Sequence, residues 1–388
     1  MTSVLPAKPY PAKGEQAFHR ALQRETSAYL RANHDHRFAD RGQFIKAGLL
    51  FLGCIVCYAL SLMQQTAWAF FLSYFSFIML SMVLNIIVNH DASHNTFFRN
   101  RTLNRVVGRI VTLPLGIDPD YWRLRHVDFH HLYPNVDFHH LYPNVEHYDL
   151  DTEENGIFRQ TPFQRHRSYM RYQHLYWPLV AAFSLPYIAW IFDWADRLGN
   201  TPVNAHSAQS GRGGWLIFIA SKVGHLLLLL VIPIMVGAAH GISPGIVLLS
   251  YLLGQMLASL LVVFLLLGTH WAEAEFYAVA DAEAMPQGWY QHNFATACDW
   301  LPTPRWLEHW TGGLHLHLTH HLFPGWHHRH YPALAAILRR VAAEHGMNYR
   351  CITYRELLSS QRRFLKSMGE GNDRRTAPHT AEHQSEEE

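Results

Sequence analysis

Histidine is the residue type whose number and spacing point to chemistry in this chain. It supplies 29 of the 388 residues. Eight of these histidines fall into three short clusters, in which the recurring separations are three and four residues. Side chains so spaced stack on one side of a helix, about a turn apart, where their rings can converge. The clusters are His90 and His94, then His126, His130 and His131, then His317, His320 and His321.

Converging imidazoles predict a metal site. Imidazole suits iron, copper, zinc and nickel, so the ligand type alone does not select the metal. One His-xxx-His pair is weak evidence, because two histidines at helical spacing arise readily by chance. Three clusters, each beside or between apolar stretches, are much stronger evidence for a single site.

The apolar residues that must position these clusters are concentrated in four blocks, at 47–63, 68–88, 215–238 and 245–268. A helix needs about 20 apolar residues to cross a bilayer. Short connections at 64–66 and around 240–244 pair the blocks into two hairpins. The sequence therefore predicts an all-α membrane protein with four transmembrane helices in two hairpins.

The distribution of Lys and Arg predicts the orientation of these helices. Neither short connection contains a cation, whereas the segments before and after the first hairpin contain many. By the positive-inside rule both termini and the long middle segment face the cytoplasm, with all three histidine clusters in a helical cap there. The cations are Lys8, Lys13, Arg20, Arg24, Arg31, Arg37, Arg41 and Lys46 before the hairpin, and Arg99, Arg101, Arg105 and Arg109 after it.

A fifth apolar stretch, at 175–192, contains Pro178 and Pro186. If it spanned the membrane, the third histidine cluster would lie on the opposite side from the first two. We therefore interpret it as an interfacial or re-entrant segment, with a true span as the alternative. Inside the third block, Lys222 is expected to extend to the cytoplasmic face, and His225 to be a packed or hydrogen-bonded helix residue.

A tandem repeat interrupts the second cluster. The sequence VDFHHLYPN at 127–135 recurs letter for letter at 136–144. Nine residues of α-helix turn through about 900°, so His139 and His140 could not serve the same site as the pair in the first copy. Only in the first copy does a histidine, His126, stand four residues before the His-His pair. If this copy binds metal, the helix that carries the ligands can also end before Pro134. We expect the first copy to bind metal and the second to be an inserted loop.

Three motifs resemble those of the membrane fatty acid desaturase superfamily, over residues of about 45 to 350. They are His90-Asp-Ala-Ser-His94, then Trp122-Arg-Leu-Arg-His126-Val-Asp-Phe-His130-His131, then Gly312-Gly313-Leu-His-Leu-His317-Leu-Thr-His320-His321-Leu-Phe-Pro324. The resemblance implies a non-haem di-iron centre in the cytoplasmic cap, with O2 as co-substrate, that removes hydrogens from an acyl chain. It also implies a further ligand just after the fourth span, where His270 stands. The implied iron ligands are His90, His94, His126, His130, His131, His270, His317, His320 and His321.

We expect several residues near these ligands to have supporting roles. Asp91, Asp128 and Glu273 are candidates to orient the ligand rings by accepting their second N–H groups. His315 is expected to be structural or to support a ligand. The cluster around 326–330 is expected to be a basic surface that touches lipid headgroups or an electron-donor protein.

The leading hypothesis for function is a bacterial acyl desaturase in the inner membrane, acting on a lipid, a thioester or a free acid. Two alternatives use the same chemistry, namely a fatty acid hydroxylase and a fatty acid decarboxylase that forms a 1-alkene. A membrane metal transporter is the alternative from another class. Electrons are expected from a separate donor of the ferredoxin, rubredoxin or cytochrome type with its reductase, and the expected surroundings are membrane lipids, with no nucleic-acid partner.

Three regions are expected along the chain. Residues 1–45 form a cytoplasmic N-terminal segment, and residues 46–350 form the desaturase domain. Residues 351–388 form a C-terminal segment that ends in a disordered tail, because the chain loses its apolar residues there.

Overall fold

The computed structural model describes residues 14–130, 144–145, 155–201, 203, 211–266, 268–271, 274–277, 285 and 287–371. Within these ranges the side chains of residues 128–130, 266, 268 and 270 are not included. The second repeat copy, except its last residue, and the tail from residue 372 lie outside the described residues, so the expectations for them stay predictions.

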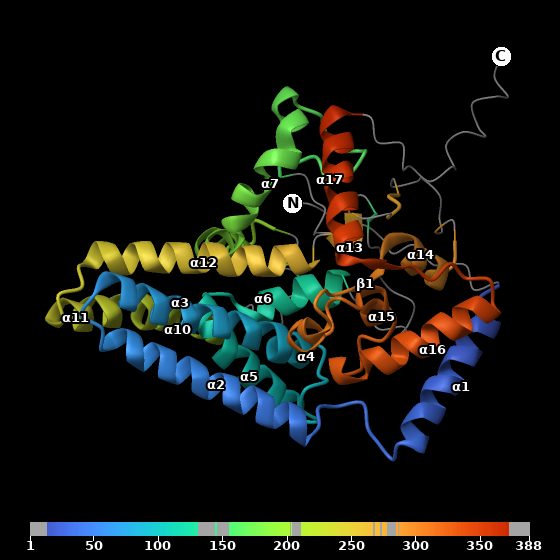
Figure 1. Ribbon diagram of the computed structural model, residues 1–388, viewed down its shortest axis with the longest axis horizontal. Coiled ribbons are helices and arrows are strands. Elements are labelled where there is room, and N and C mark those ends of the chain that lie inside the picture. The colour runs from blue at the N-terminus through green and yellow to red at the C-terminus, as the bar shows by residue number, and fades with distance from the viewer. Residues whose placement is uncertain are drawn as a thin grey trace.

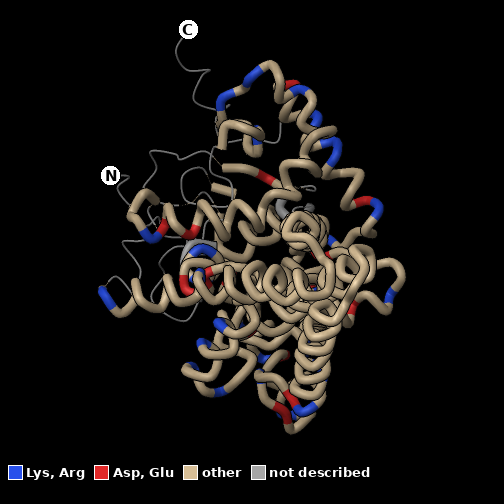
Figure 2. Tube along the Cα trace, turned by 90° about the vertical axis from the view of Figure 1, so that its left-hand side faces the viewer, with Lys and Arg blue, Asp and Glu red and all other residues tan. Residues whose placement is uncertain are grey.

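Four helices in the described residues are long and apolar enough to cross a membrane, in agreement with the four spans expected, and a bent pair would make a fifth if it crossed as one span. Figure 1 shows them running along the long axis of the molecule. Figure 2, which looks along them, shows charged residues mainly at the margins of the bundle. The first is α2 (Arg41–Leu62); the second joins α3 (Ala67–Leu84), η1 (Asn85–Asn89) and α4 (His90–Ser93); the third joins α10 (Arg212–Leu226), η8 (Leu227–Val231) and α11 (Ile232–Ala239); the fourth is α12 (Pro244–Leu266).

Capping side chains explain why two of these helices begin where they do. The carboxylate of Asp40 accepts a hydrogen bond from the Gln43 N–H, so α2 begins several residues before its apolar stretch. The hydroxyl of Thr66 accepts one from the Ala69 N–H and begins α3. The second span continues beyond its apolar block as far as Ser93, and it thereby carries the first histidine cluster on its own end.

Helix α3 forms the centre of the bundle, between α2 and α12. Its Phe70, Tyr74 and Ile78 are fully buried. The outer surface of α2, in contrast, exposes large apolar side chains such as Leu49 and Leu52. Lipid is a favourable environment for such a surface, whereas water is not. This arrangement supports an integral membrane protein.

The fifth apolar stretch forms a bent pair of helices, with an angle of 58° between its two parts. Pro186 explains the break, because it lacks the N–H that would bond to residue 182 and its ring crowds that carbonyl. The first part comprises η5 (Ser168–Tyr172) and α7 (Gln173–Ala182), and the second comprises α8 (Ser184–Tyr187), η6 (Ile188–Phe192) and α9 (Asp193–Arg197).

Short helices gather with the histidine clusters at one end of the bundle (Figure 1). The described residues are mostly helical, consistent with the expected all-α class, and one short parallel strand pair is present. It joins β1 (Asp299–Leu301) to β2 (Cys351–Thr353), with Trp300 opposite Ile352. The helices of this region are α1 (Gln16–Ala32), α5 (Arg101–Thr112), η2 (Leu113–Leu115), α6 (Pro119–Arg123), η3 (Leu124–His130), α13 (Gly268–Trp271), α14 (Trp289–Thr296), η9 (Arg305–Trp310), α15 (His317–Leu322), η10 (His328–His330), α16 (Tyr331–Glu344) and α17 (Tyr354–Glu370).

Two packing contacts connect the chain ends to this region. Helix α1 lies against α16 and buries Phe18 and Leu22 in a shared apolar cluster. Helix α17 lies against α7, η5 and α13, where Phe364 and Leu365 are buried.

The expectation for Lys222 was wrong, and that for His225 is confirmed. Lys222 is buried and donates hydrogen bonds to an Asp193 carboxylate oxygen at 2.6 Å and to the carbonyls of Gly116 and Ala189. Partners inside the protein therefore satisfy the ammonium, and it does not extend to the surface. His225 is hydrogen-bonded through Nδ1 to the Leu113 carbonyl and through Nε2 to a tyrosine hydroxyl.

Candidate metal centre

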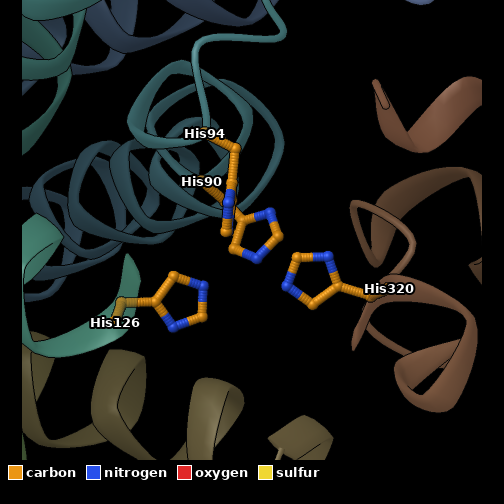
Figure 3. Close-up of side chains that lie close together, drawn as sticks. All are labelled: His90, His94, His126 and His320. Carbon is orange, nitrogen blue, oxygen red and sulfur yellow. The ribbon is translucent and has the colours of Figure 1, made fainter. Parts of the chain in front are cut away.

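Four histidines from three separate segments converge at the end of the bundle. His90 and His94 come from α4 and the residue that ends it, His126 comes from η3, and His320 comes from α15. One ring nitrogen of each lies within 4.8 Å of one from every other. Figure 3 shows the four rings facing a common space. The sequence prediction that all three clusters meet is thus realised by at least one residue of each.

Two of the segments that carry these histidines contain π-helical turns. His90 follows η1 directly, and His126 lies within η3. A π-helical turn closes its hydrogen bonds over five residues, so it changes the direction in which the following side chains point. The sequence analysis assumed α-helical geometry at both places. The sequence gives no sign of the wider turn, because one turn is too short for its apolar periodicity to distinguish the two helix types.

The four rings are in an environment that favours neutral imidazole. His90, His94 and His320 are almost completely buried. Burial, together with the neighbouring imidazoles of His90, His94 and His126, holds the pKa of His320 well below its ordinary value. A neutral ring offers the lone pair that a metal ion requires. The donor set is therefore ready for a metal at neutral pH.

His90 supplies a direct test of whether the site suits a metal. Both of its ring nitrogens are buried, and neither makes a hydrogen bond with any part of the chain that the structure describes. Leaving a buried polar group unsatisfied costs about 1–3 kcal/mol. Metal–nitrogen bonds of about 2.0–2.1 Å, as for zinc, put two ligands at most about 4.2 Å apart, and the nitrogens of the four histidines lie within 4.8 Å of one another. A metal ion would satisfy this ring, so the residues fit the implied group.

The remaining members of the third cluster lie beside this group. His317 and His321 face each other on α15 with 3.1 Å between their Nε2 atoms, and both are buried. Their separation is one that two nitrogens on a single ion can adopt. They are not members of the group of four, which contains His90, His94, His126 and His320.

Three predicted ligands cannot be placed. The side chains of His130 and His270 and the whole of His131 lie outside the described residues. The same holds for the side chains of Asp128 and Glu273. Their proposed roles stay predictions.

His315 takes a structural position, as expected. Its Nδ1 is 2.6 Å from the Thr311 hydroxyl, and its ring is buried against Trp300. Burial lowers its pKa to about 4, so the ring is neutral. It is not a member of the group of four.

The expectation that residues 326–330 form a basic surface was wrong. His327, His328 and His330 are buried, with 0%, 8% and 1% of their surface exposed. The ring of His328 donates to the Asp91 carboxylate through a short contact, and His327 Nε2 lies 3.3 Å from the same carboxylate. Asp91 is therefore paired with this segment rather than with a ring of the group of four.

Comparison with known proteins agrees with the geometry. The family model described as fatty acid desaturase matches residues 66–353. The chain belongs to the fatty acid desaturase family. The match includes all three histidine clusters and three of the four spans, leaving out only the first.

The desaturase is similar to several curated enzymes. It is 28% identical to sn-1 linoleoyl-lipid 6-desaturase of Synechocystis sp., over 74% of this chain and 76% of the relative. It is 25% identical to the enzyme of the same name from Arthrospira platensis, over 90% and 92% of the two chains. It is 22% identical to acyl-lipid (8-3)-desaturase of Physcomitrium patens, over 88% and 69%. These relatives support a fatty acyl desaturase, an oxidoreductase, over the hydroxylase, decarboxylase and transporter alternatives.

The desaturase also has an apolar groove of about 640 Å³ between α3, α12 and the segment 300–311. Its lining approaches the histidines at Ile86, four residues before His90, and at Thr311, which contacts His315. Gly312 makes this close approach possible, because its φ is +58° and an added Cβ would lie 2.7 Å from the Ile86 carbonyl oxygen. An apolar tunnel was expected, but its lining could not be named from the sequence, because it comes from four distant parts of the chain.

Proposed function

We propose that the chain introduces a double bond into the acyl chain of a membrane lipid, using O2 and two iron ions held by the predicted histidines. The observation that carries this proposal is the convergence of four imidazoles, three of them buried, beside a long apolar groove. The names of the relatives support an acyl-lipid substrate over a thioester or a free acid.

One iron is assigned to the group of four, His90, His94, His126 and His320. The second is assigned to His317 and His321 together with His130, His131 and His270. The bound irons would supply the oxidising power needed to remove hydrogen from an unactivated C–H bond, which no side-chain base can do. The protein's own residues hold the ligand rings neutral and oriented, and they keep water from the site.

The groove is assigned to the acyl chain. Its volume lies in the range of about 300–1,000 Å³ that is usual for small-molecule sites. Each buried methylene contributes about 0.8 kcal/mol, so recognition rests on chain length and shape. Three lining residues, Leu257, Trp306 and Trp310, are exposed on the outer surface. An opening on the apolar side of α12 supports entry of the chain directly from the bilayer.

The positive-inside rule supports a cytoplasmic metal centre, and two cyanobacterial relatives support a bacterial membrane. We assign residues 46–350 as the catalytic domain, close to the range matched by the family model. The bent segment is assigned to the membrane interface, because Leu175, Leu179 and Phe183 form an exposed apolar stripe along it. Electrons are assigned to a separate ferredoxin, rubredoxin or cytochrome-type donor with its reductase.

The test is reconstitution of the purified full chain with iron, O2, a reductase and each donor type in turn. Lipids carrying acyl chains of varied length would be supplied, with the same chains as thioesters and free acids, and the products analysed by mass spectrometry. We expect about two irons per chain and a product of unchanged chain length that has lost two hydrogens. A hydroxylated product, a hydrocarbon one carbon shorter, or metal uptake into vesicles would each contradict the proposal. His320→Ala provides the inactive control.

A further inference from the structure

We infer that residues 327–331 are a positioning device that fixes the distance between the two helices carrying His90 and His320, and that residues 29–38 support it. The inference rests on the proposed metal centre and adds a function for a segment that belongs to none of the three histidine clusters. The segment connects to one helix through Asp91 and to the other through Tyr331.

The first connection is the carboxylate of Asp91, which is 1% exposed and follows His90 directly in α4. It accepts hydrogen bonds from the His328 ring, from the His328 backbone N–H at 3.3 Å and from the Thr96 hydroxyl at 3.4 Å. Removing one partner from a buried charge is costly, so the carboxylate holds α4 against residues 327 and 328. Thr96 reinforces this by donating its N–H and O–H to the Asp91 carbonyl.

The second connection is the hydroxyl of Tyr331, the first residue of α16. It lies 2.8 Å from Nδ1 of His320. When Nδ1 donates its N–H to this hydroxyl oxygen, Nε2 carries the lone pair that can bind a metal. Partners of this kind fix the tautomer and the ring direction of a ligand. The His90 and His320 rings, with centroids 4.5 Å apart, are thus both held from the same short segment.

The hydrogen bonds favour positioning over a separate metal site at Asp91, His327 and His328, although these three side chains lie close enough to hold an ion. The Nδ1 atom of His327 accepts the Arg329 backbone N–H at 3.1 Å. A ring that accepts through Nδ1 carries its proton on Nε2, which faces Asp91. That nitrogen therefore has no lone pair to give to a metal.

The N-terminal segment supports the device from outside. Arg329 donates to both carboxylate oxygens of Asp35 at 2.7 and 2.6 Å, and to the carbonyls of His36 and Phe38. A two-pronged pair of this kind fixes direction as well as distance. The ring of His330 is also held by this segment. Its Nδ1 lies 3.1 Å from the Tyr29 hydroxyl, and its Nε2 lies 2.9 Å from the His36 carbonyl.

The test compares two variants that each remove one tyrosine hydroxyl. Tyr331→Phe removes the contact to His320, whereas Tyr290→Phe removes a partly buried contact to His19, which belongs to none of the three histidine clusters, at 2.6 Å. Iron affinity would be measured by titration of the metal-free full chain, and iron environment by Mössbauer spectroscopy. We expect about 10–100-fold weaker binding of one iron and an altered spectrum for Tyr331→Phe, as is usual when a ligand loses its hydrogen-bond partner. Tyr290→Phe should match the unaltered chain.

A second pair of variants keeps the inference testable if Tyr331→Phe does not fold. Arg329→Gln should weaken the same iron, and Arg329→Lys, which retains the charge but not the two-pronged geometry, should restore part of the affinity. If the unaltered chain binds about two irons and both Tyr331→Phe and Arg329→Gln bind them equally well, the inference is wrong and the proposed function stands. If the unaltered chain binds no iron, the proposed function fails and the inference fails with it.

Discussion

The guanidinium of Arg125 is paired with the buried carboxylate of Asp196, its Nε lying 2.9 Å from one oxygen. Arg125 stands beside the proposed ligand His126, and Asp196 lies at the end of the bent segment. The backbone N–H of Asp118, which begins α6, likewise donates to Asp193 on the same segment. The bent segment therefore holds the helical segment, α6 and η3, that carries His126.

This pairing predicts the effect of Asp196→Asn. Loss of one partner from a buried pair costs about 3–5 kcal/mol, so we expect a clear fall in melting temperature and weaker iron binding. The matched control is Asp120→Asn, because Asp120 pairs with Arg109 while both are about a quarter exposed. Exposed pairs contribute at most about 1 kcal/mol. Equal melting temperatures for the two variants would contradict the prediction.

The Asp35–Arg329 pair predicts a pH-dependent stability. Hydrogen bonds from Arg329 hold the pKa of the Asp35 carboxyl well below its ordinary value. Such a group stabilises the fold above its unfolded pKa of about 4, and the contribution is lost as the pH falls toward the lower, folded pKa. We expect Asp35→Asn to melt at a lower temperature at pH 7, with the difference narrowing as the pH falls below about 4. Thermal unfolding from pH 7 to pH 2.5 measures this, and a difference that is constant with pH would refute it.

The groove predicts that a bulky residue beside the acyl chain lowers substrate affinity without changing iron content. Val83→Trp would displace two or three methylene groups, which is about 2 kcal/mol at about 0.8 kcal/mol each, or about thirtyfold in affinity. The effect should appear in KM for long acyl chains and be smaller for short ones. Leu49→Trp, on the exposed surface of α2, is the matched control. A loss of iron in Val83→Trp would indicate damage to the fold instead.

The tandem repeat predicts an asymmetry between its two copies. Replacing His139 and His140 together with Ala should leave the bound iron at about two per chain. Replacing His130 and His131 with Ala should remove at least one. Metal analysis of both purified variants decides the matter, and the opposite pattern would show that the second copy supplies the ligands.

The parts of the fold that follow from local sequence were predictable. The four spans follow from uninterrupted apolar runs, and their number did not depend on any distant contact. The start of α2 was missed because the cap at Asp40 lies outside the apolar run. The break in the bent segment follows from Pro186, which was visible in the sequence.

The parts that depend on distant partners were not predictable in this way. Lys222 bonds to Asp193, which is 29 residues distant in the sequence. His328 bonds to Asp91, which is 237 residues distant. Without such partners, a run of histidines and arginine is reasonably interpreted as surface, and that interpretation was wrong here. A carboxylate beside a ligand, as in His90-Asp91, was nevertheless a sign that some buried donor must exist elsewhere in the chain.

The second span reaches from Ala67, directly after the short connection at 64–66, to Ser93, at the end that carries His90. A helix whose apolar length exceeds the local hydrocarbon thickness tilts to fit. His320 belongs to the cap, and we infer that residues 327–331 keep it at a fixed distance from His90. The metal centre is therefore expected to move together with the second span, so the iron content should stay constant in nanodiscs of graded lipid length.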